Sequence, residues 1–374
     1  MKKSLFICLT ALMVVAVSCK KNPNGTDPKV QEPSAKTLEA NEIGPYSARL
    51  HAMIDFAGID WDGVNYGFCW GTSGNALDTY IEGEGLDEEN AYSSVLDGLA
   101  AGTQYWFKAY VDIDGKYYSG ETVSFKTTPV PEGAVDLGIV MTREDGTTYK
   151  LYWAACNLGE DGFVSSPEQY GDYYAWGELE PYYAKGHSQD IFCSDWRVID
   201  GRTIGGYFWS SYKFATGPEY RNLTKYCPEN KSDQWNGTGN PDNKVVLESG
   251  PDGDDVASHM FGGNWRMATD AEWAALKEQC VWTWTDNYND TGVAGRIVTG
   301  NVDGYRNTSI FFPAAGLREG SLLENQGEFG YYWSSSLFTV DPKQARYTSF
   351  GENGVFGYPS ERIDGKSVRP VYED

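Results

Sequence analysis

The chain has 374 residues, and a length prior of roughly 150 residues per domain predicts two domains. Aspartate and glutamate total 53 against 30 lysines and arginines, so the formal net charge at pH 7 is −23. A field of that sign repels a phosphate backbone, which excludes nucleic acid as a partner. The three histidines, His51, His187 and His259, are spread along the chain and offer no cluster for a transition metal.

The first residues have the pattern of a bacterial secretion signal. A positive Lys2-Lys3 start precedes a mainly apolar run over residues 5–17, shorter than the ~20 residues that a membrane-spanning helix needs. The run ends at Ser18-Cys19, which resembles a lipobox, where the cysteine is lipidated and becomes the mature N-terminus. We therefore expect a signal peptide over residues 1–18 and a membrane anchor on Cys19, with the outer membrane of the cell envelope as the location. The alternative is an ordinary cleavage site with a chance cysteine.

The next segments predict a tether and a β-sandwich. Residues 19–34 hold too few apolar side chains to fold and form a flexible tether. Over residues 35–128 apolar and polar side chains alternate in short runs typical of strands, and Asp114-Gly115 between two runs predicts a type I′ hairpin. Residues 99–105 resemble the tyrosine corner of fibronectin type III sandwiches, in which a hydroxyl ties a loop to the backbone. No group of residues in this domain suggests a catalytic or binding site, so a role as a spacer is favoured over ligand binding.

The second domain is expected over residues 134–374, after a stiff linker at 129–133 with two prolines. Residues 181–255 hold few regular runs, and so long an irregular stretch inside a compact domain usually serves as binding loops. Six carboxylates of the hard type that Ca²⁺ prefers lie there: Asp233, Asp242, Glu248, Asp252, Asp254 and Asp255. Ca²⁺ is thus a candidate cofactor, and the alternative is a solvated acidic surface.

One segment of the second domain predicts a helix. Thr269 and Glu272 have the spacing of a capping box, so the helix begins directly after Thr269. Trp273, Leu276 and Cys280 then recur on one face as an apolar stripe that needs a sheet to bury it. We therefore expect Trp273 in the core of the domain.

The same segment carries a family resemblance. Residues 262–273, Gly-Gly-Asn-Trp-Arg-Met-Ala-Thr-Asp-Ala-Glu-Trp, resemble the signature of the Fibrobacter succinogenes major paralogous domain, a relative of the formylglycine-generating-enzyme and C-type-lectin-like folds. Further motifs resemble that family in the same order: residues 153–159, 171–178, 223–227, 312–316, 331–336 and 367–371. The resemblance implies a mainly β domain with one central helix (α+β), lectin-like and rich in long loops. It also implies that residues 135–139 pair with residues 368–371 at its base.

Candidate contact residues lie shortly before the closing strand. Residues 346–362 mix arginine, tyrosine and phenylalanine with glycine, a composition suited to an interface. We single out Arg346, Tyr347, Tyr358 and Arg362 as ligand-binding and expect them near the loops of residues 181–255, away from the linker. Trp333 is expected in the core. The alternative is an ordinary half-exposed hairpin.

The sequence shows no set of residues typical of catalysis, neither a Ser-His-Asp triad nor a close pair of activated carboxylates. The formylglycine-generating relatives hold copper between two cysteines, but no local pattern at Cys227 or Cys280 matches that pair, so such an oxidase is a remote alternative.

Beyond the leader and Cys19 five cysteines remain, an odd number. An exported protein can form disulfides, and Cys193 with Cys227 is the first expectation. All five being reduced is the alternative.

The sequence therefore predicts a non-enzymatic lipoprotein of the cell envelope. In this interpretation a fibronectin type III-like sandwich presents a lectin-like domain that binds a glycan or protein ligand. A structural or filament-associated surface subunit is the alternative from a different class.

Overall fold

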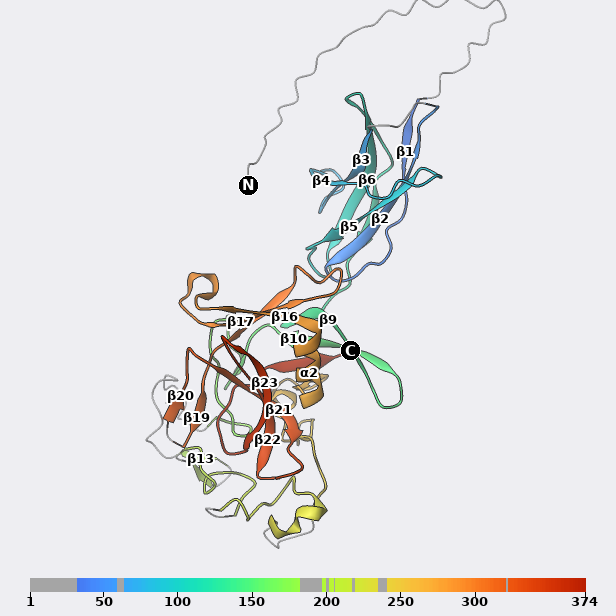
Figure 1. Cartoon of the computed structure of the whole chain (residues 1–374). Helices are drawn as coiled ribbons and strands as arrows, with labels where there is room; N and C mark the ends of the chain where they lie inside the picture. The colour runs from blue at the N-terminus through green and yellow to red at the C-terminus, as the bar shows by residue number, and fades with distance from the viewer. Residues whose placement is uncertain are drawn as a thin grey trace, which may run out of the picture.

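The computed structural model describes residues 32–58, 64–181, 197–199, 202–204, 206–216, 219–234, 241–320 and 322–374. The predicted signal peptide, the predicted lipidation site Cys19, nearly all of the predicted tether, His187 and Cys193 lie outside the described residues. The described chain is mainly β, as predicted, with its first sheets above the others in Figure 1. Within the described residues no helix has the length and apolar character needed to cross a membrane.

The first part of the chain folds as two facing antiparallel sheets, which confirms the predicted β-sandwich. One sheet has the order β1 (Ser34–Thr37), β2 (Ser47–Asp55), β5 (Ala91–Asp97). The other has the order β4 (Thr79–Glu82), β3 (Asn65–Gly71), β6 (Gln104–Ile113), β7 (Lys116–Ser119), with β8 (Val123–Lys126) also paired with β6. Every second residue along β2 and most of β6 is buried, because the inner faces of both sheets meet in one core.

Two local predictions in this sandwich are confirmed. Asp114 and Gly115 join β6 to β7 with φ angles of 54° and 81°, positive at both positions as a type I′ turn requires. The Tyr105 hydroxyl accepts a hydrogen bond from the Ala100 backbone N–H at 2.9 Å and so ties the preceding loop to the strand.

The second part contains a four-stranded antiparallel sheet that holds its first and last strands. The order is β15 (Trp265–Met267), β24 (Pro370–Glu373), β10 (Thr148–Ala154), β9 (Ala134–Thr142). The expected direct pairing of residues 135–139 with 368–371 is therefore wrong, since β10 lies between β9 and β24. The turn at Asp145-Gly146 folds β10 back onto β9. The last strand, β24, then pairs with the other edge of β10.

The other regular elements of this part are short. They are β11 (Leu158–Gly159), β12 (Gly162–Phe163), β13 (Arg197–Ile199), β14 (Arg202–Ile204), η1 (Glu229–Gln234), α1 (Val256–Phe261), η2 (Tyr288–Asp290), β19 (Leu317–Glu319) and β20 (Leu322–Glu324). Two three-stranded antiparallel sheets complete the fold: β16 (Cys280–Thr285), β17 (Gly295–Gly300), β18 (Ser309–Pro313), and β21 (Gly330–Leu337), β22 (Gln344–Gly351), β23 (Gly354–Glu361). The described part of residues 181–255 is mostly loop, as predicted, and lies at the end away from the sandwich in Figure 1.

The predicted helix is α2 (Asp270–Gln279), and its capping box is present. The Thr269 hydroxyl accepts from the Glu272 backbone N–H at 3.3 Å, and the Glu272 carboxylate accepts from the Thr269 N–H at 2.8 Å. Trp273 and Leu276 are buried, and the Trp273 ring lies edge-on to that of Trp153 at 4.7 Å between centroids. The apolar stripe thus faces a sheet, as its spacing predicts.

Candidate binding surface on strands β21 to β23

The sheet β21-β22-β23 lies between two apolar cores. Successive side chains on a strand point to opposite faces, so neighbours in sequence enter different cores. Tyr332 and Phe350 join the core that contains α2 and β10. Trp333 and Ala345 join the core beneath the long loops. Trp333 is almost fully buried, which confirms its predicted place in the core.

Five aromatic side chains form a continuous row on the face that carries Trp333, and we call this row the aromatic ribbon. Its members, in spatial order, are Phe329, Tyr331, Tyr347, Tyr358 and Phe356. Consecutive ring centroids are 6.1, 6.0, 6.2 and 6.0 Å apart. The ribbon crosses all three strands and ends in two exposed rings, since Phe356 and Tyr358 keep 46% and 47% of their surface accessible.

The strand register explains how the ribbon forms. Tyr347 lies directly opposite Tyr358 across β22 and β23, so their side chains share one face. Phe329 precedes β21 and reaches the row because Gly351 has no side chain: a Cβ there would lie 2.8 Å from the Phe329 ring.

Tyr347 anchors the ribbon to the core. Its ring lies edge-on to Trp333 at 6.0 Å, and the Lys366 ammonium lies 4.8 Å from the Tyr347 ring and 4.3 Å from the Trp333 ring. Burial and the neighbouring Tyr331 raise the pKa of Tyr347 to about 12. The phenol is therefore neutral at physiological pH and keeps its hydroxyl proton for donation.

Polar side chains border the ribbon. The Asn325 amide donates to the Tyr331 hydroxyl at 3.1 Å. Beyond Tyr347, the Lys366 ammonium donates to Ser360 Oγ and Asp364 Oδ2, both at 3.0 Å, and Ser360 Oγ also bonds to Asp364. Flat apolar rings edged by amide, hydroxyl and carboxylate groups can stack on a sugar ring and hydrogen-bond its hydroxyls.

The structure brings two of the four predicted contact residues together, Tyr347 and Tyr358. Arg346 lies on the opposite face, because it precedes Tyr347 by one residue. Its side chain borders a shallow groove of about 230 Å³ between α2 and β22–β23, with its Nε 3.8 Å from the Asp270 carboxylate. Arg346 and the tyrosines therefore cannot contact one small ligand from the same side of the sheet.

The prediction for Arg362 is wrong, because this side chain is fully buried. Its guanidinium donates to the backbone carbonyls of Pro342, Lys225 and Tyr226, the last at 2.6 Å. A buried guanidinium needs acceptors for its fixed fork of donors, and these carbonyls provide them. Arg362 does lie beside the long loops, as predicted, but it fastens them to the turn after β23 instead of facing a ligand.

Phe329 and Tyr331 were not predicted as contact residues. Their signal was the period-two spacing of Phe329, Tyr331 and Trp333, which places all three on one face of a strand. Phe356 was one of the candidate contact residues of the segment 346–362, although it was not among the four chosen as ligand-binding.

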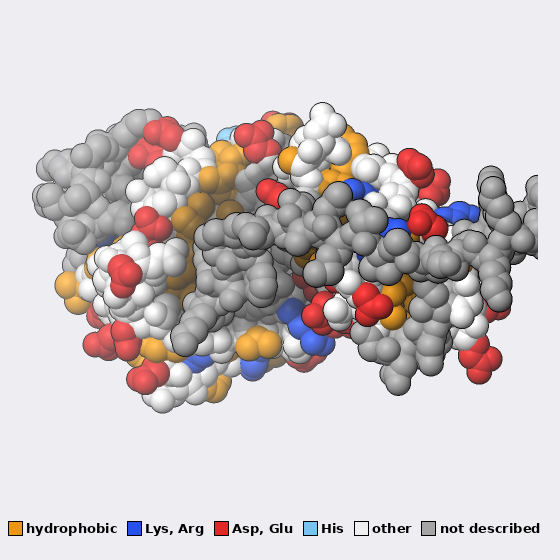
Figure 2. Space-filling view, turned by 90° about the horizontal axis from the view of Figure 1, so that it is seen from above, with side chains coloured by type: hydrophobic (Ala, Val, Ile, Leu, Met, Phe, Trp, Pro, Cys, Tyr) orange, Lys and Arg blue, Asp and Glu red, His pale blue; other side chains and the backbone are white. Residues whose placement is uncertain are grey.

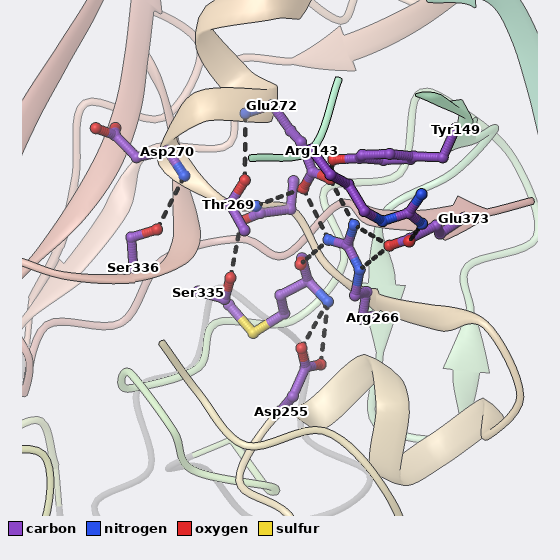
Figure 3. A network of polar contacts seen from close by, with 12 residues as sticks. Arg143, Tyr149, Asp255, Arg266, Thr269, Asp270, Glu272, Ser335, Ser336 and Glu373 are labelled. Carbon is purple, nitrogen blue, oxygen red and sulfur yellow. Dashed lines mark hydrogen bonds and ion pairs between the residues drawn. The ribbon is translucent and has the colours of Figure 1, made fainter. Parts of the chain in front are cut away.

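The signature segment of residues 262–273 forms an internal polar network (Figure 3). Arg266 makes two hydrogen bonds to the Glu272 carboxylate, at 2.7 and 2.5 Å, and a third at 2.8 Å to Glu373 of the last strand. Glu272 also accepts from the Tyr149 hydroxyl at 2.9 Å, and Arg143 pairs with Glu373. The network joins α2, β15, β10 and β24, so Arg266 and Glu272 have a structural role in this segment.

Two buried carboxyls of this network have opposite pKa shifts. Burial alone would raise the pKa of Glu272, but the hydrogen bonds and charge of Arg266 outweigh it and hold that pKa below its usual range. Asp255 is also buried, and burial raises its pKa to about 6 although it accepts from the Ser258 and Met267 backbone N–H groups. These amides lie at the start of α1 and in β15, so Asp255 is a structural cap.

Several carboxylates of the predicted calcium loop already have partners within the chain. Asp254 pairs with Lys213 at 2.8 Å and with Lys225, while Glu248 pairs with Lys225 and Lys244. Asp242 accepts from the Tyr226 N–H at 2.9 Å. Among the described residues no three His, Cys, Asp or Glu side chains are grouped so as to hold a metal ion. A calcium ion at this loop would have to displace these lysines.

Cys69, Cys156, Cys227 and Cys280 are free thiols. The predicted partner of Cys227 in a disulfide, Cys193, lies outside the described residues, so this pairing stays a prediction. The Cys227 thiol donates to the Lys231 carbonyl at 3.4 Å. Burial raises the pKa of Cys280 to about 12 and also raises that of Cys227, so both stay protonated near neutral pH.

Comparison with known proteins identifies no family for this chain. No family model matches it, and no curated protein matches it. Among solved structures, the sensor domain of the anti-sigma factor RsgI4 from Pseudobacteroides cellulosolvens is 22% identical over 27% of this chain and 100% of that one, with a TM-score of 0.22. A fibronectin type III domain of the human KIAA0970 protein is 13% identical over 26% of this chain and 79% of that one, with a TM-score of 0.19. At these TM-scores the similarity is a coarse one between β-sandwiches and supports no inference about function.

Proposed function

We propose that this protein is a non-enzymatic binding protein of the cell envelope and that the aromatic ribbon is its glycan-binding surface. The observation that supports the proposal is the row of five rings ending in the exposed Tyr358 and Phe356. Exposed large apolar side chains that lie together mark an interaction site more often than scattered ones do. Aromatic rings also lose little conformational entropy on binding.

The setting of the binding domain follows from the sequence. A lipid on Cys19 and the tether would hold the chain at the outer membrane, with the sandwich as spacer and the lectin-like fold implied by the family resemblance carrying the ribbon outward. The buried, protonated thiols of Cys227 and Cys280 weigh against the remote oxidase alternative, because a thiolate is the form that acts as nucleophile or metal ligand.

The proposal is tested on a glycan array with the unlipidated chain from residue 20 onward. We expect binding that Tyr358→Ala weakens at least about tenfold, equivalent to ~1.4 kcal/mol. Tyr80→Ala is the control, because Tyr80 is also an exposed strand tyrosine, on the sandwich, with 63% of its surface accessible against 47% for Tyr358. The proposal fails if no glycan binds, or if the Tyr358 and Tyr80 variants bind alike.

A further inference from the structure

A second groove lies beside the aromatic ribbon, between the β19–β20 hairpin, residues 206–208 and the turn that follows β23. It has a volume of about 420 Å³. Two large apolar side chains in its lining are open to solvent, Phe208 at 45% and Leu322 at 60%. We call it the acidic groove for the charges described next.

The apolar side of this groove is held in place by the backbone. The Tyr207 N–H donates to the Gly320 carbonyl at 3.0 Å, which fixes residues 206–208 against the hairpin. Gly320 has a φ of 55°, and a Cβ at this position would lie 3.1 Å from the Phe208 ring. The exposure of Phe208 is thus a consequence of a defined turn.

The polar side of the groove is negatively charged. Four carboxylates line it, Glu319, Glu324, Glu361 and Asp364, and its described lining contains no lysine or arginine. The nearby Lys366 is buried and bonded to Asp364 and Ser360. Burial raises the pKa of Glu319, and so do the charges of Asp364, Glu324 and Glu361. The charge of Lys366 opposes this shift and pairs with Asp364, but the described lining offers no lysine or arginine to Glu319, Glu324 or Glu361.

Carboxylate side chains are spread over the molecular face in Figure 2, so a negative field by itself is common on this protein. The acidic groove differs in combining that charge with two exposed apolar side chains in one concave lining. A hydrated metal ion would gain nothing from Phe208 and Leu322, and a neutral sugar could hydrogen-bond the carboxylates but would leave their charges without a cation. A polypeptide with lysine or arginine beside an apolar residue is complementary to both features.

We propose that the acidic groove docks a basic segment of a partner protein. An apolar side chain of the segment lies between Phe208 and Leu322, and flanking lysine or arginine side chains reach Glu319, Glu324 and Glu361. This proposal is independent of the glycan-binding proposal, which concerns the rings of the ribbon.

The test uses the unlipidated chain and fluorescence anisotropy with three synthetic peptides of equal length. In the first, lysines flank a single leucine, and in the others serines or glutamates replace the lysines. We expect the lysine peptide to bind at least about tenfold more tightly than the serine peptide and to weaken as salt is added. The glutamate peptide should not bind.

Variants locate the contact. The double variant Glu319→Gln with Glu361→Gln and the single variant Leu322→Ser should each weaken the lysine peptide about tenfold. A control with the same charge change, Glu88→Gln with Glu89→Gln, alters exposed residues of the sandwich and should leave binding unchanged. Thermal melting checks that all variants fold.

The inference is overturned if the serine peptide binds as tightly as the lysine peptide, if none of the peptides binds, or if groove and control variants lose the same affinity. Tyr358→Ala should leave the lysine peptide bound while it removes glycan, so the two proposals can fail separately.

Discussion

Arg346 and Tyr347 are neighbours in sequence, yet they face opposite sides of one sheet and belong to different environments. Arg346 borders α2 near Asp270, whereas Tyr347 continues the aromatic ribbon. The alternation of side chains along a strand requires this separation. A composition rich in arginine and tyrosine thus indicated an interface segment, but only the register could show which residues share a face.

Tyr347 and Tyr358 are opposite each other and should respond differently to truncation. Tyr347→Ala removes a ring packed on Trp333 and should lower the free energy of unfolding by about 2 kcal/mol or more. Tyr358→Ala removes a ring that is about half exposed and should change the free energy of unfolding by less than about 1 kcal/mol. Urea unfolding of both variants measures the difference. Equal losses would place Tyr358 in the core as well and remove it from the binding surface.

Arg266 is the most connected charge of the signature segment, with hydrogen bonds to Glu272 and Glu373. Arg266→Ala leaves the Glu272 carboxylate buried without its cation, and removing one partner of a buried pair costs about 3 to 5 kcal/mol. We expect a loss of that size in urea unfolding. The control is Arg306→Ala, which breaks an exposed pair with Asp303 and should cost less than about 1 kcal/mol. Similar losses would contradict a structural role for Arg266.

Asp255 should make the stability depend on pH in a direction opposite to that of most carboxylates. Its folded pKa of about 6 lies above the ordinary value of 3.8, so between these pH values the folded chain binds more protons than the unfolded chain. Its contribution to stability is therefore full below pH 3.8 and is lost as pH rises through 6.

Asp255→Asn keeps an oxygen for the Ser258 and Met267 amides and cannot ionise. Relative to the parent, this variant should gain on the order of 2 to 3 kcal/mol of unfolding free energy between pH 4 and pH 7. Urea midpoints of both chains across this range provide the measurement. A difference that does not change with pH would show that Asp255 titrates near its ordinary pKa.

At the scale of single elements, α2 was the most predictable part of the second domain. The capping box and apolar stripe involve residues a few positions apart, so their geometry follows from the sequence directly. The strands of the sandwich were also predictable where polar and apolar residues alternate, as along β2 and β6. The pattern is weaker along β5, where Ser93 and Ser94 interrupt the apolar residues although every second residue is buried.

The burial of arginine and lysine side chains could not be predicted from the sequence pattern. Arg362, Lys366 and Arg369 are buried, although arginine and lysine are almost never fully buried unless paired. Arg369 donates to Asn157 Oδ1 and to the carbonyls of Ala154, Ala155 and Phe311, none of which lies near it in sequence. Only the assembled fold supplies such acceptors, so sequence reasoning placed Arg362 on the surface.

The apolar face of α2 should determine whether the second part of the chain folds. Trp273 packs on Trp153 and Phe312, and Trp273→Ala should cost about 3 to 5 kcal/mol. Lys277→Ala changes the exposed face of the same helix and should cost less than about 0.5 kcal/mol. Thermal unfolding monitored by circular dichroism compares the melting temperatures of the two variants. If Trp273→Ala melts like the parent chain, α2 does not anchor this core.

At the scale of the whole molecule, Gly304 packs against Ser47 of the sandwich, and a polar joint around Tyr46 forms a further contact between the sandwich and the second part. The Tyr46 hydroxyl accepts from the Asp136 backbone N–H at 3.3 Å, and the Tyr46 ring lies edge-on to Tyr305 at 6.3 Å. Lys150 donates to the Tyr305 hydroxyl at 3.1 Å and pairs with Asp136. The joint thus connects β9 and β10 to the loop before β2, and the apolar cores of the two parts share no residue.

A joint of this kind can orient the binding surfaces without stabilising either core. Tyr46→Ala removes both the ring contact with Tyr305 and the acceptor for the Asp136 N–H. We expect this variant to broaden the distance distribution between spin labels placed on the two parts. Its free energy of unfolding in urea should change by less than about 1 kcal/mol. Tyr46→Phe keeps the ring and loses only the acceptor, so it should broaden the distribution less. The control is Tyr80→Ala, which lies on an outer strand of the sandwich and should leave the distribution unchanged. An unchanged distribution in Tyr46→Ala would mean that Tyr46 does not set the orientation, which the linker at residues 129–133 and the packing of Gly304 against Ser47 would then hold.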